Sequence, residues 1–187
     1  HSGRSQGLTI EQVAAIHLYT QVCAFHKGLN GALGGWGAGG EAAIPHYLPY
    51  IKIAMGALAV LKKIETTVYR GIRGVPLEVL LDGKGVGDEL EWWAFNSTTG
   101  TADVLRDPDF FGVGAEHGER VVFVIEVKSG VRIKSFSSLG SLLEYYMQPF
   151  GATAQNEDEI MLPPGIKFVL DSIEKFPDGV TQVKMHE

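Results

Sequence analysis

The 187-residue sequence contains a single cysteine, Cys23, so the chain cannot form an internal disulfide. It also lacks an excess of positive charge, because it contains 16 Lys and Arg residues and 22 Asp and Glu residues, which gives a net charge of −6. Contacts to phosphate backbones need a basic surface, so nucleic acid is not an expected partner. No apolar run is long enough to cross a bilayer, and no membrane association is expected either.

Other absences concern metal chemistry and targeting. The six histidines show no spacing typical of a metal site, and we predict no metal. Cys23 follows Val13 and Ile16 at helical spacing, which favours a buried position over a role as nucleophile. No signal peptide is recognisable, and the opening HSGRSQG resembles a tag remnant or a trimmed terminus. We expect a soluble monomer, either cytoplasmic or secreted without disulfides.

The chain is 45% hydrophobic and 20% charged, a composition typical of globular proteins, and its length fits one domain spanning residues 1–187. Thr9 and Gln12 predict a capping box for a first helix that ends near Gly28. After a glycine-rich stretch, a second helix is predicted over about 44–63. The residues expected to form its buried stripe are Tyr47, Ile51, Met55, Leu58 and Leu61.

From Thr66 onward the hydrophobic period changes to two, which is typical of strands. Helices first and strands afterwards predict an α+β fold, with a helical lobe over about 8–64 and antiparallel sheets forming a β core over about 66–187. The segment GKGVG at 83–87 lacks a phosphate-loop pattern, and we interpret it as a hairpin loop. The expected strands are TTVYRGIR, ELEWWAFNST, RVVFVIEV, IKFVLDSI and VTQVKM.

Three short stretches stand out within this pattern. Arg70 lies inside the apolar run TVYRGIRG, which indicates a surface position, an ion pair, or a fixed cation suited to a phosphate. The stretch FNSTTG at 95–100 ends a strand with hydroxyl groups. In NEDEIMLPPGIKF, at 156–168, three acidic residues precede an apolar strand. Taken alone, each of the last two also fits an ordinary strand end or a solvated loop tip.

Taken together and in this order, the stretches closely resemble the arginine-serine-glutamate class of mono-ADP-ribosyltransferases, the cholera-toxin-like branch. The resemblance covers nearly the whole chain and implies a β-sandwich of two antiparallel sheets around an NAD cleft. It also implies NAD as the substrate. Residues 139–156 depart from it, because relatives have a shorter segment there, and this leaves the choice of protein target open. The matching segments are YT at 19–20, LN at 29–30, TVYRG at 67–71, FNSTT at 95–99, FFG at 110–112 and EDEIMLPPGIKF at 157–168.

The resemblance implies roles for the residues that bind and activate NAD. Glu159 matches the catalytic glutamate, which stabilises the charge that develops on the ribose and holds its 2′-hydroxyl. Ser97 is expected to hydrogen-bond Glu159 and the ribose, with Thr98 beside it in the NAD-binding set. Arg70 is expected to grip the diphosphate or the adjoining ribose, and the backbone of Gly71 to approach the nicotinamide amide.

Two further assignments concern the nicotinamide and the acceptor. Phe111 resembles the aromatic residue that stacks on nicotinamide, with Phe110 as the alternative and core packing possible for both. Residues two apart in an extended segment share a face, so Glu157 and Glu159 are expected to point the same way and Asp158 to face solvent. A glutamate at the position of Glu157 implies an arginine acceptor on a protein target.

The function expected from the sequence is therefore transfer of ADP-ribose from NAD to arginine. The nearest alternative is an NAD glycohydrolase that uses the same pocket with water as the acceptor. A more distant alternative is a pseudo-enzyme or an NAD-dependent binding module.

Overall fold

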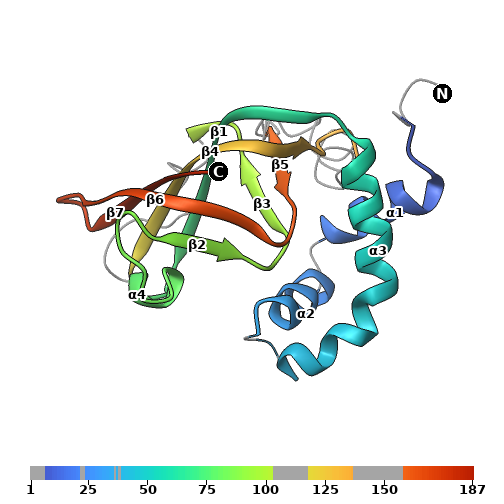
Figure 1. Ribbon diagram of the computed structural model, residues 1–187, viewed down its shortest axis with the longest axis horizontal. Helices are drawn as coiled ribbons and strands as arrows, with labels where there is room; N and C mark the ends of the chain where they lie inside the picture. The colour runs from blue at the N-terminus through green and yellow to red at the C-terminus, as the bar shows by residue number, and fades with distance from the viewer. Residues whose placement is uncertain (1–6, 22–23, 36, 38, 103–117, 137–157) are drawn as a thin grey trace, which may run out of the picture.

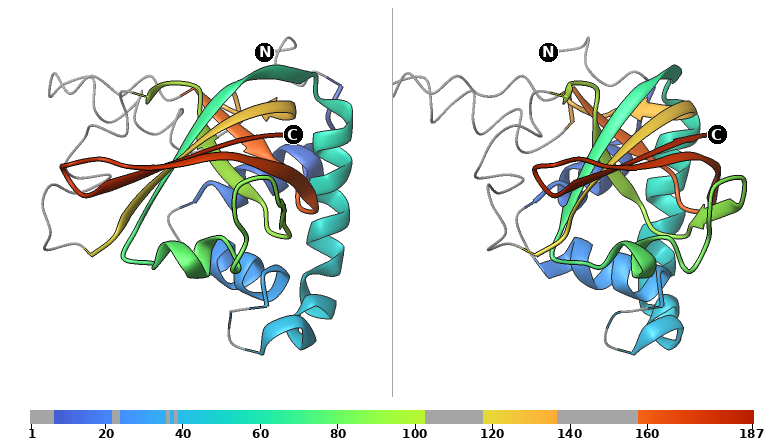
Figure 2. Two further views of the ribbon diagram at one scale, coloured as in Figure 1. Left: turned by 60° about the vertical axis from the view of Figure 1, so that its left-hand side comes forward. Right: turned by 90° about the vertical axis from the view of Figure 1, so that its left-hand side faces the viewer.

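The computed structural model describes residues 7–21, 24–35, 37, 39–102, 118–136 and 158–187. Three helices come first in the chain, and strands make up most of the rest (Figure 1). The long helix α3 stands along one side of the molecule, with the strands extending away from it (Figure 1 and the left view of Figure 2). This confirms the predicted α+β class and the predicted order of helices and strands.

Helix α1 (Ile10–Tyr19) begins at the predicted capping box. The side chain of Thr9 accepts from the backbone N–H of Gln12, and the side chain of Gln12 accepts from the backbone N–H of Thr9. Both contacts satisfy backbone donors that the first helical turn leaves without partners.

The prediction that the first helix ends near Gly28 is wrong, because α1 ends at Tyr19 and a separate helix α2 (Ala24–Leu33) runs through Gly28. Gly28 lies inside this helix because α2 passes very close to Tyr47 of α3, where a Cβ on Gly28 would lie 2.5 Å from the Tyr47 Oη. Gly31 is likewise internal, and a Cβ on Gly37 would come within 2.7 Å of its backbone. These glycines allow close packing, which outweighs their low helix propensity.

After the short 3₁₀ helix η1 (Gly40–Ala43), helix α3 (Ile44–Val60) follows the predicted second helix closely. Leu58 and Leu61 are buried, and Tyr47 and Ile51 pack against the same core, as predicted. Met55 is 37% exposed, so its predicted place in the buried stripe is wrong, and the small side chains of Ala54 and Ala57 are buried instead.

The strands form one hydrogen-bonded sheet, in the order β1-β3-β5-β4-β7-β6-β2. Strand β1 pairs with both β3 and β4, and the ring of pairings β1-β3-β5-β4 therefore closes on itself. The strands are β1 (Lys63–Arg73), β2 (Glu89–Trp92), β3 (Asn96–Thr99), β4 (Arg120–Arg132), β5 (Glu159–Leu162), β6 (Ile166–Lys175) and β7 (Val180–His186).

This topology corrects two details of the expected sandwich, namely two separate sheets and antiparallel pairing throughout. Within the described residues, the β4–β5 pairing joins the seven strands into one sheet, the β1–β4 pairing is an additional link, and β4 pairs with β7 in parallel. Strands β6 and β7 form an antiparallel hairpin, and β7 rather than β6 lies beside β4. Period-two hydrophobicity marks a strand but says nothing about its direction, which is why the sequence did not reveal this pair.

The short helix α4 (Leu77–Leu80) lies between β1 and β2, so GKGVG at 83–87 is a turn between a helix and a strand and not the predicted hairpin loop. Two buried clusters support the fold. One joins the helices to the sheet through Phe95, Val131 and Met161, and the other packs the sheet residues around Phe123 and Phe168. No helix within the described ranges is long and apolar enough to cross a membrane.

Candidate active site

Ser97 of β3 and Glu159 of β5 are brought together by the register of their two strands. Ser97 lies opposite Met161, and Thr99 lies opposite Glu159, so Ser97 and Glu159 are diagonal neighbours on one face. The Ser97 Oγ donates a hydrogen bond of 3.0 Å to Glu159 Oε1. Glu159 is only 8% exposed, so this carboxylate has a fixed direction in a largely water-poor setting.

Arg70 of β1 reaches the same place from the neighbouring strand. Its Nη1 donates to the backbone oxygen of Ser97 at 2.7 Å, and its guanidinium carbon lies 5.9 Å from the centre of the Trp92 ring. Burial lowers the pKa of the Arg70 guanidinium, and the nearby Tyr19 acts in the opposite direction. An arginine keeps its charge at ordinary pH, so the strands hold a fixed cation beside a fixed carboxylate.

Trp92 of β2 is a part of this arrangement that the sequence did not predict. Its ring makes edge contacts with Phe123 and Phe168, at centroid distances of 5.3 and 5.1 Å. The two phenylalanines hold the indole in place, and its face is offered to Arg70 as a cation–π partner. The motif EWW suggested a strand, but only the pairing of strands shows which aromatic ring lies under the guanidinium.

The helical lobe fixes the start of β3 through Tyr19 and Asn30. The Asn30 amide donates to the Phe95 oxygen at 3.0 Å and accepts from the Phe95 N–H at 3.2 Å, as a neighbouring strand would. Asn30 also donates to Tyr19 Oη, which itself donates to the Phe95 oxygen at 2.8 Å. Phe95 precedes Ser97 by two residues, so both helices help to position the serine.

The environment of Tyr19 shows how near it lies to the charged pair. Burial raises the pKa of the Tyr19 phenol, Asn30 and the positive charge of Arg70 lower it, and the negative charge of Glu159 raises it again. YT and LN were noticed in the sequence as recurring segments with no assigned role. Their role in the structure is to join the helices to the strand that carries Ser97.

Asp158, between the two glutamates of the motif, does not simply face solvent as expected. Both of its carboxylate oxygens accept from Arg132 Nε, at 2.9 and 3.0 Å. The backbone oxygen of Asp158 accepts from the N–H of Gly100. The backbone oxygen of Glu159 accepts from the N–H of Ile133. Asp158 is therefore tied to the ends of both β3 and β4.

Other candidate residues from the sequence are placed differently or lie outside the described ranges. Thr98 is 5% exposed, and its hydroxyl donates to the Ile160 oxygen at 2.7 Å, on the opposite face of β3 from Ser97. Gly71 follows Arg70 on β1 and pairs with Val122 of β4. The residues outside the described ranges are Cys23, Phe110, Phe111, Gly112 and Glu157, together with segment 139–156.

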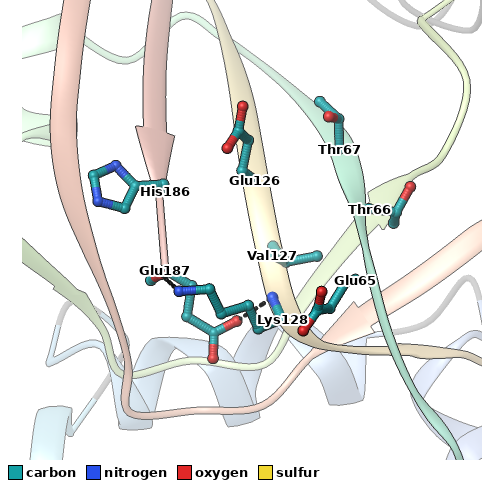
Figure 3. A pocket seen from close by; sticks show the side chains of 8 residues that line it. All are labelled: Glu65, Thr66, Thr67, Glu126, Val127, Lys128, His186 and Glu187. Atoms are coloured by element: carbon teal, nitrogen blue, oxygen red, sulfur yellow. Dashed lines mark hydrogen bonds between the residues drawn. The ribbon is translucent and has the colours of Figure 1, made fainter.

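A separate surface cavity lies over β1, β4 and the end of β7 (Figure 3). It shares no residue with the cluster around Arg70, and Lys128 and Glu187 are hydrogen-bonded to each other in its wall (Figure 3). Within the part of the chain that the structure describes, no group of three His, Cys, Asp or Glu side chains is arranged to hold a metal ion. The lining residues are Glu65, Thr66, Thr67, Glu126, Val127, Lys128, His186 and Glu187.

Comparison with known proteins identifies the fold and the family. The family model described as NAD:arginine ADP-ribosyltransferase matches residues 2–168. A search of curated proteins found no match. Among solved structures, Vis toxin, an ADP-ribosyltransferase from Vibrio splendidus, superimposes with a TM-score of 0.69 at 21% identity, covering 99% of this chain and 76% of Vis.

Two further solved structures are similar in the same way. The ADP-ribosyltransferase HopU1 of Pseudomonas syringae pv. tomato gives a TM-score of 0.69 at 23% identity, covering 99% of this chain and 79% of HopU1. The type III effector XopAI from Xanthomonas axonopodis pv. citri gives 0.67 at 18% identity, covering 98% of this chain and 65% of XopAI. The chain therefore has the ADP-ribosyltransferase fold.

Proposed function

The chain belongs to the NAD:arginine ADP-ribosyltransferase family, and from this premise we propose that it transfers ADP-ribose from NAD to arginine side chains of a protein target, with release of nicotinamide. The observation that supports this most strongly is the cluster of Arg70, Ser97 and Glu159, which three different strands bring together. We propose that residues 1–187 act as one catalytic unit and as a monomer.

Glu159 serves the bond-breaking step in this proposal. When the bond between the ribose C1′ and the nicotinamide nitrogen breaks, its electron pair leaves with nicotinamide and positive charge develops on the ribose. A buried carboxylate already aimed by Ser97 stabilises that charge with little reorganisation. The same carboxylate accepts a hydrogen bond from the ribose 2′-hydroxyl, and Ser97 contacts the ribose beside it.

Arg70 holds the diphosphate or the adjoining ribose. One of its N–H groups is occupied by the Ser97 oxygen, which fixes the direction of the guanidinium, and its other donors serve the ligand. Gly71 offers its backbone to the nicotinamide amide, and Phe111 stacks on the nicotinamide ring. Thr98 supports the site from behind, because its hydroxyl holds β3 against β5.

Glu157 acts on the acceptor. A guanidinium has a pKa above about 12 and attacks C1′ only when a base takes its proton. Glu157 is two residues before Glu159 and supplies that base. The description of the matching family as arginine-directed supports this assignment. Vis was crystallised in complex with agmatine, a small guanidinium compound, which makes agmatine a suitable test acceptor here.

The test uses labelled NAD and agmatine, with both products, ADP-ribosyl-agmatine and free ADP-ribose, measured in one reaction. For Glu157→Gln we expect transfer to agmatine to collapse while slow hydrolysis of NAD persists, since water needs less help than a guanidinium. If both products fall by the same factor, Glu157 belongs to the NAD site and the arginine assignment is wrong. If the unmodified protein forms only ADP-ribose, it is an NAD glycohydrolase.

A further inference from the structure

The start of β5 is held by contacts that the catalytic proposal does not use. Strand β5 is four residues long and Glu159 is its first residue, so its own pairing gives the glutamate little support on the N-terminal side. Three contacts replace that support: the Gly100 N–H to Asp158 at 2.9 Å, the Ile133 N–H to Glu159 at 3.0 Å, and Arg132 Nε to the Asp158 carboxylate.

Asp158 is closely packed against Gly100, the residue that follows β3. A Cβ on Gly100 would lie 2.7 Å from Asp158 Oδ2, closer than real contacts allow, and 3.2 Å from Asp158 Cβ, which is a tight contact. Glycine at the end of FNSTTG thus makes room for the aspartate. On the other side, Arg132 is the last residue of β4, and its register partner is Ile160 of β5.

The ion pair between Arg132 and Asp158 is unlike an ordinary surface pair in its geometry. One Nε–H group meets both carboxylate oxygens at nearly equal distance, and the pair raises the pKa of the Arg132 guanidinium. The Arg132 side chain is 55% exposed and that of Asp158 30% exposed, and pairs this exposed contribute little to global stability. What the pair does fix is the backbone immediately before Glu159.

We propose that Arg132 is a positioning residue for catalysis, which holds Asp158 against Gly100 and thereby sets the Glu159 carboxylate at its distance from Ser97. This inference rests on the proposed role of Glu159. Loss of the pair lets the start of β5 move, so the carboxylate no longer meets the developing charge. Errors of about 1 Å in such a position cost up to about a hundredfold in rate.

Arg132→Gln keeps much of the side-chain length and removes the charge, and Arg132→Lys is the variant expected to restore part of the function. We expect Arg132→Gln to lower kcat for nicotinamide release about tenfold, with the KM for NAD and the melting temperature nearly unchanged. Arg132→Lys should have a kcat between those of Arg132→Gln and the unmodified protein. Gly100→Ala should reproduce the fall in kcat without changing any charge, because it displaces Asp158.

The control is Lys167→Gln, which breaks an ion pair between β6 and β2, with Glu89, at a side chain as exposed as that of Arg132. It should leave kcat unchanged. The inference is overturned if Arg132→Gln leaves kcat unchanged, if kcat, KM and melting temperature all change together, or if Lys167→Gln gives the same loss as Arg132→Gln.

Hydrogen exchange provides a readout that does not depend on activity. The amides of Gly100 and Ile133 donate to Asp158 and Glu159, so Arg132→Gln should speed their exchange about tenfold, while amides that pair β2 with β6 stay protected. Unchanged exchange at Gly100 and Ile133 would overturn the positioning role even if the enzyme proposal held. If Arg132→Gln exchanges faster at these amides but the unmodified protein never releases nicotinamide, the contacts at the start of β5 are supported and the enzyme proposal is rejected.

Discussion

At the scale of single residues, the site depends on Arg70, which uses one N–H group for a contact within the protein and keeps its other N–H groups for the ligand. The guanidinium gives one N–H to the Ser97 oxygen and presents its face to Trp92. A planar group with five donors can do this and still bind a diphosphate, whereas a lysine ammonium is a point charge that cannot hold the same directions. Arginine and lysine are therefore not equivalent at this position.

We expect Arg70→Lys to weaken NAD binding by about tenfold or more, because a charge-assisted contact contributes about 1.5–3 kcal/mol and lysine cannot reproduce the two-sided geometry. The measurement is NAD affinity by calorimetry. Arg73→Lys, at the exposed end of the same strand, is the matched control and should bind NAD normally. An unchanged affinity for Arg70→Lys would give Arg70 a structural role instead.

At the scale of elements, α3 contacts α2 and α1 at two glycines that have different surroundings. Gly28 of α2 faces the Tyr47 hydroxyl, where a Cβ would come within 2.5 Å. Gly56 of α3 faces the side-chain amide of Gln12, where a Cβ would lie at 3.3 Å from the end of a flexible side chain. Both are interior helix positions, at which alanine is normally favoured by about 1 kcal/mol.

Gly28→Ala should therefore destabilise the protein despite the better helix propensity of alanine, by about 1–3 kcal/mol, as overpacking usually does. Gly56→Ala should be neutral or stabilising by up to about 1 kcal/mol. Urea unfolding of both variants gives the comparison. Equal stabilisation by the two substitutions would mean that α2 does not approach Tyr47 as closely as described.

Local patterns in the sequence predicted elements well and contacts between elements poorly. The capping box at Thr9 and the grouping of Arg70, Ser97 and Glu159 depend on residue type and order, so both could be predicted. Continuation of α2 through Gly28 could not, because the reason is a phenol from another helix. Likewise, nothing in the dipeptide LN indicates that the Asn30 side-chain amide will pair with the backbone of Phe95, far away in the chain.

The sequence also failed to predict the ion-pair partner of Asp158 and the direction of strand pairing in the sheet. Alternation predicted that Asp158 faces solvent, but its carboxylate accepts from Arg132, which lies 26 residues earlier and belongs to another strand. The parallel pairing of β4 with β7 is also a long-range choice, made between strands that are both typical period-two segments. Each missed feature is a contact between residues far apart in the chain.

At the scale of the whole molecule, one tyrosine joins the helical lobe to the sheet region, and another joins two helices within the lobe. Tyr19 donates to the Phe95 oxygen of the sheet region, and Tyr50 of α3 donates to the Ala15 oxygen of α1. Burial raises the pKa of both phenols, so the folded protein favours their neutral form. A group whose pKa is raised by folding adds stability below its unfolded pKa and loses that stability as the pH rises toward the folded value.

We therefore expect the free energy of unfolding to fall as the pH rises above about 10, the ordinary pKa of tyrosine. The lowered pKa of Arg70 acts in the opposite sense, since the unfolded chain would then hold that proton more tightly. Urea unfolding between about pH 8 and 11 measures the slope. The Tyr19→Phe and Tyr50→Phe double variant should show a clearly smaller slope, and an equal slope would place the alkaline sensitivity elsewhere.

In the proposed mechanism the Glu159 carboxylate drives release of nicotinamide from NAD, and the variant Glu159→Gln removes that carboxylate alone. The substitution keeps the shape and can still accept from Ser97, but it removes the charge. Nicotinamide release should fall by about two to three orders of magnitude, while NAD affinity and melting temperature stay near their original values. Glu174→Gln, an exposed carboxylate on β6, should leave the rate unchanged. If Glu159→Gln released nicotinamide at a rate near that of the original protein, Glu159 would not be the carboxylate that drives this step.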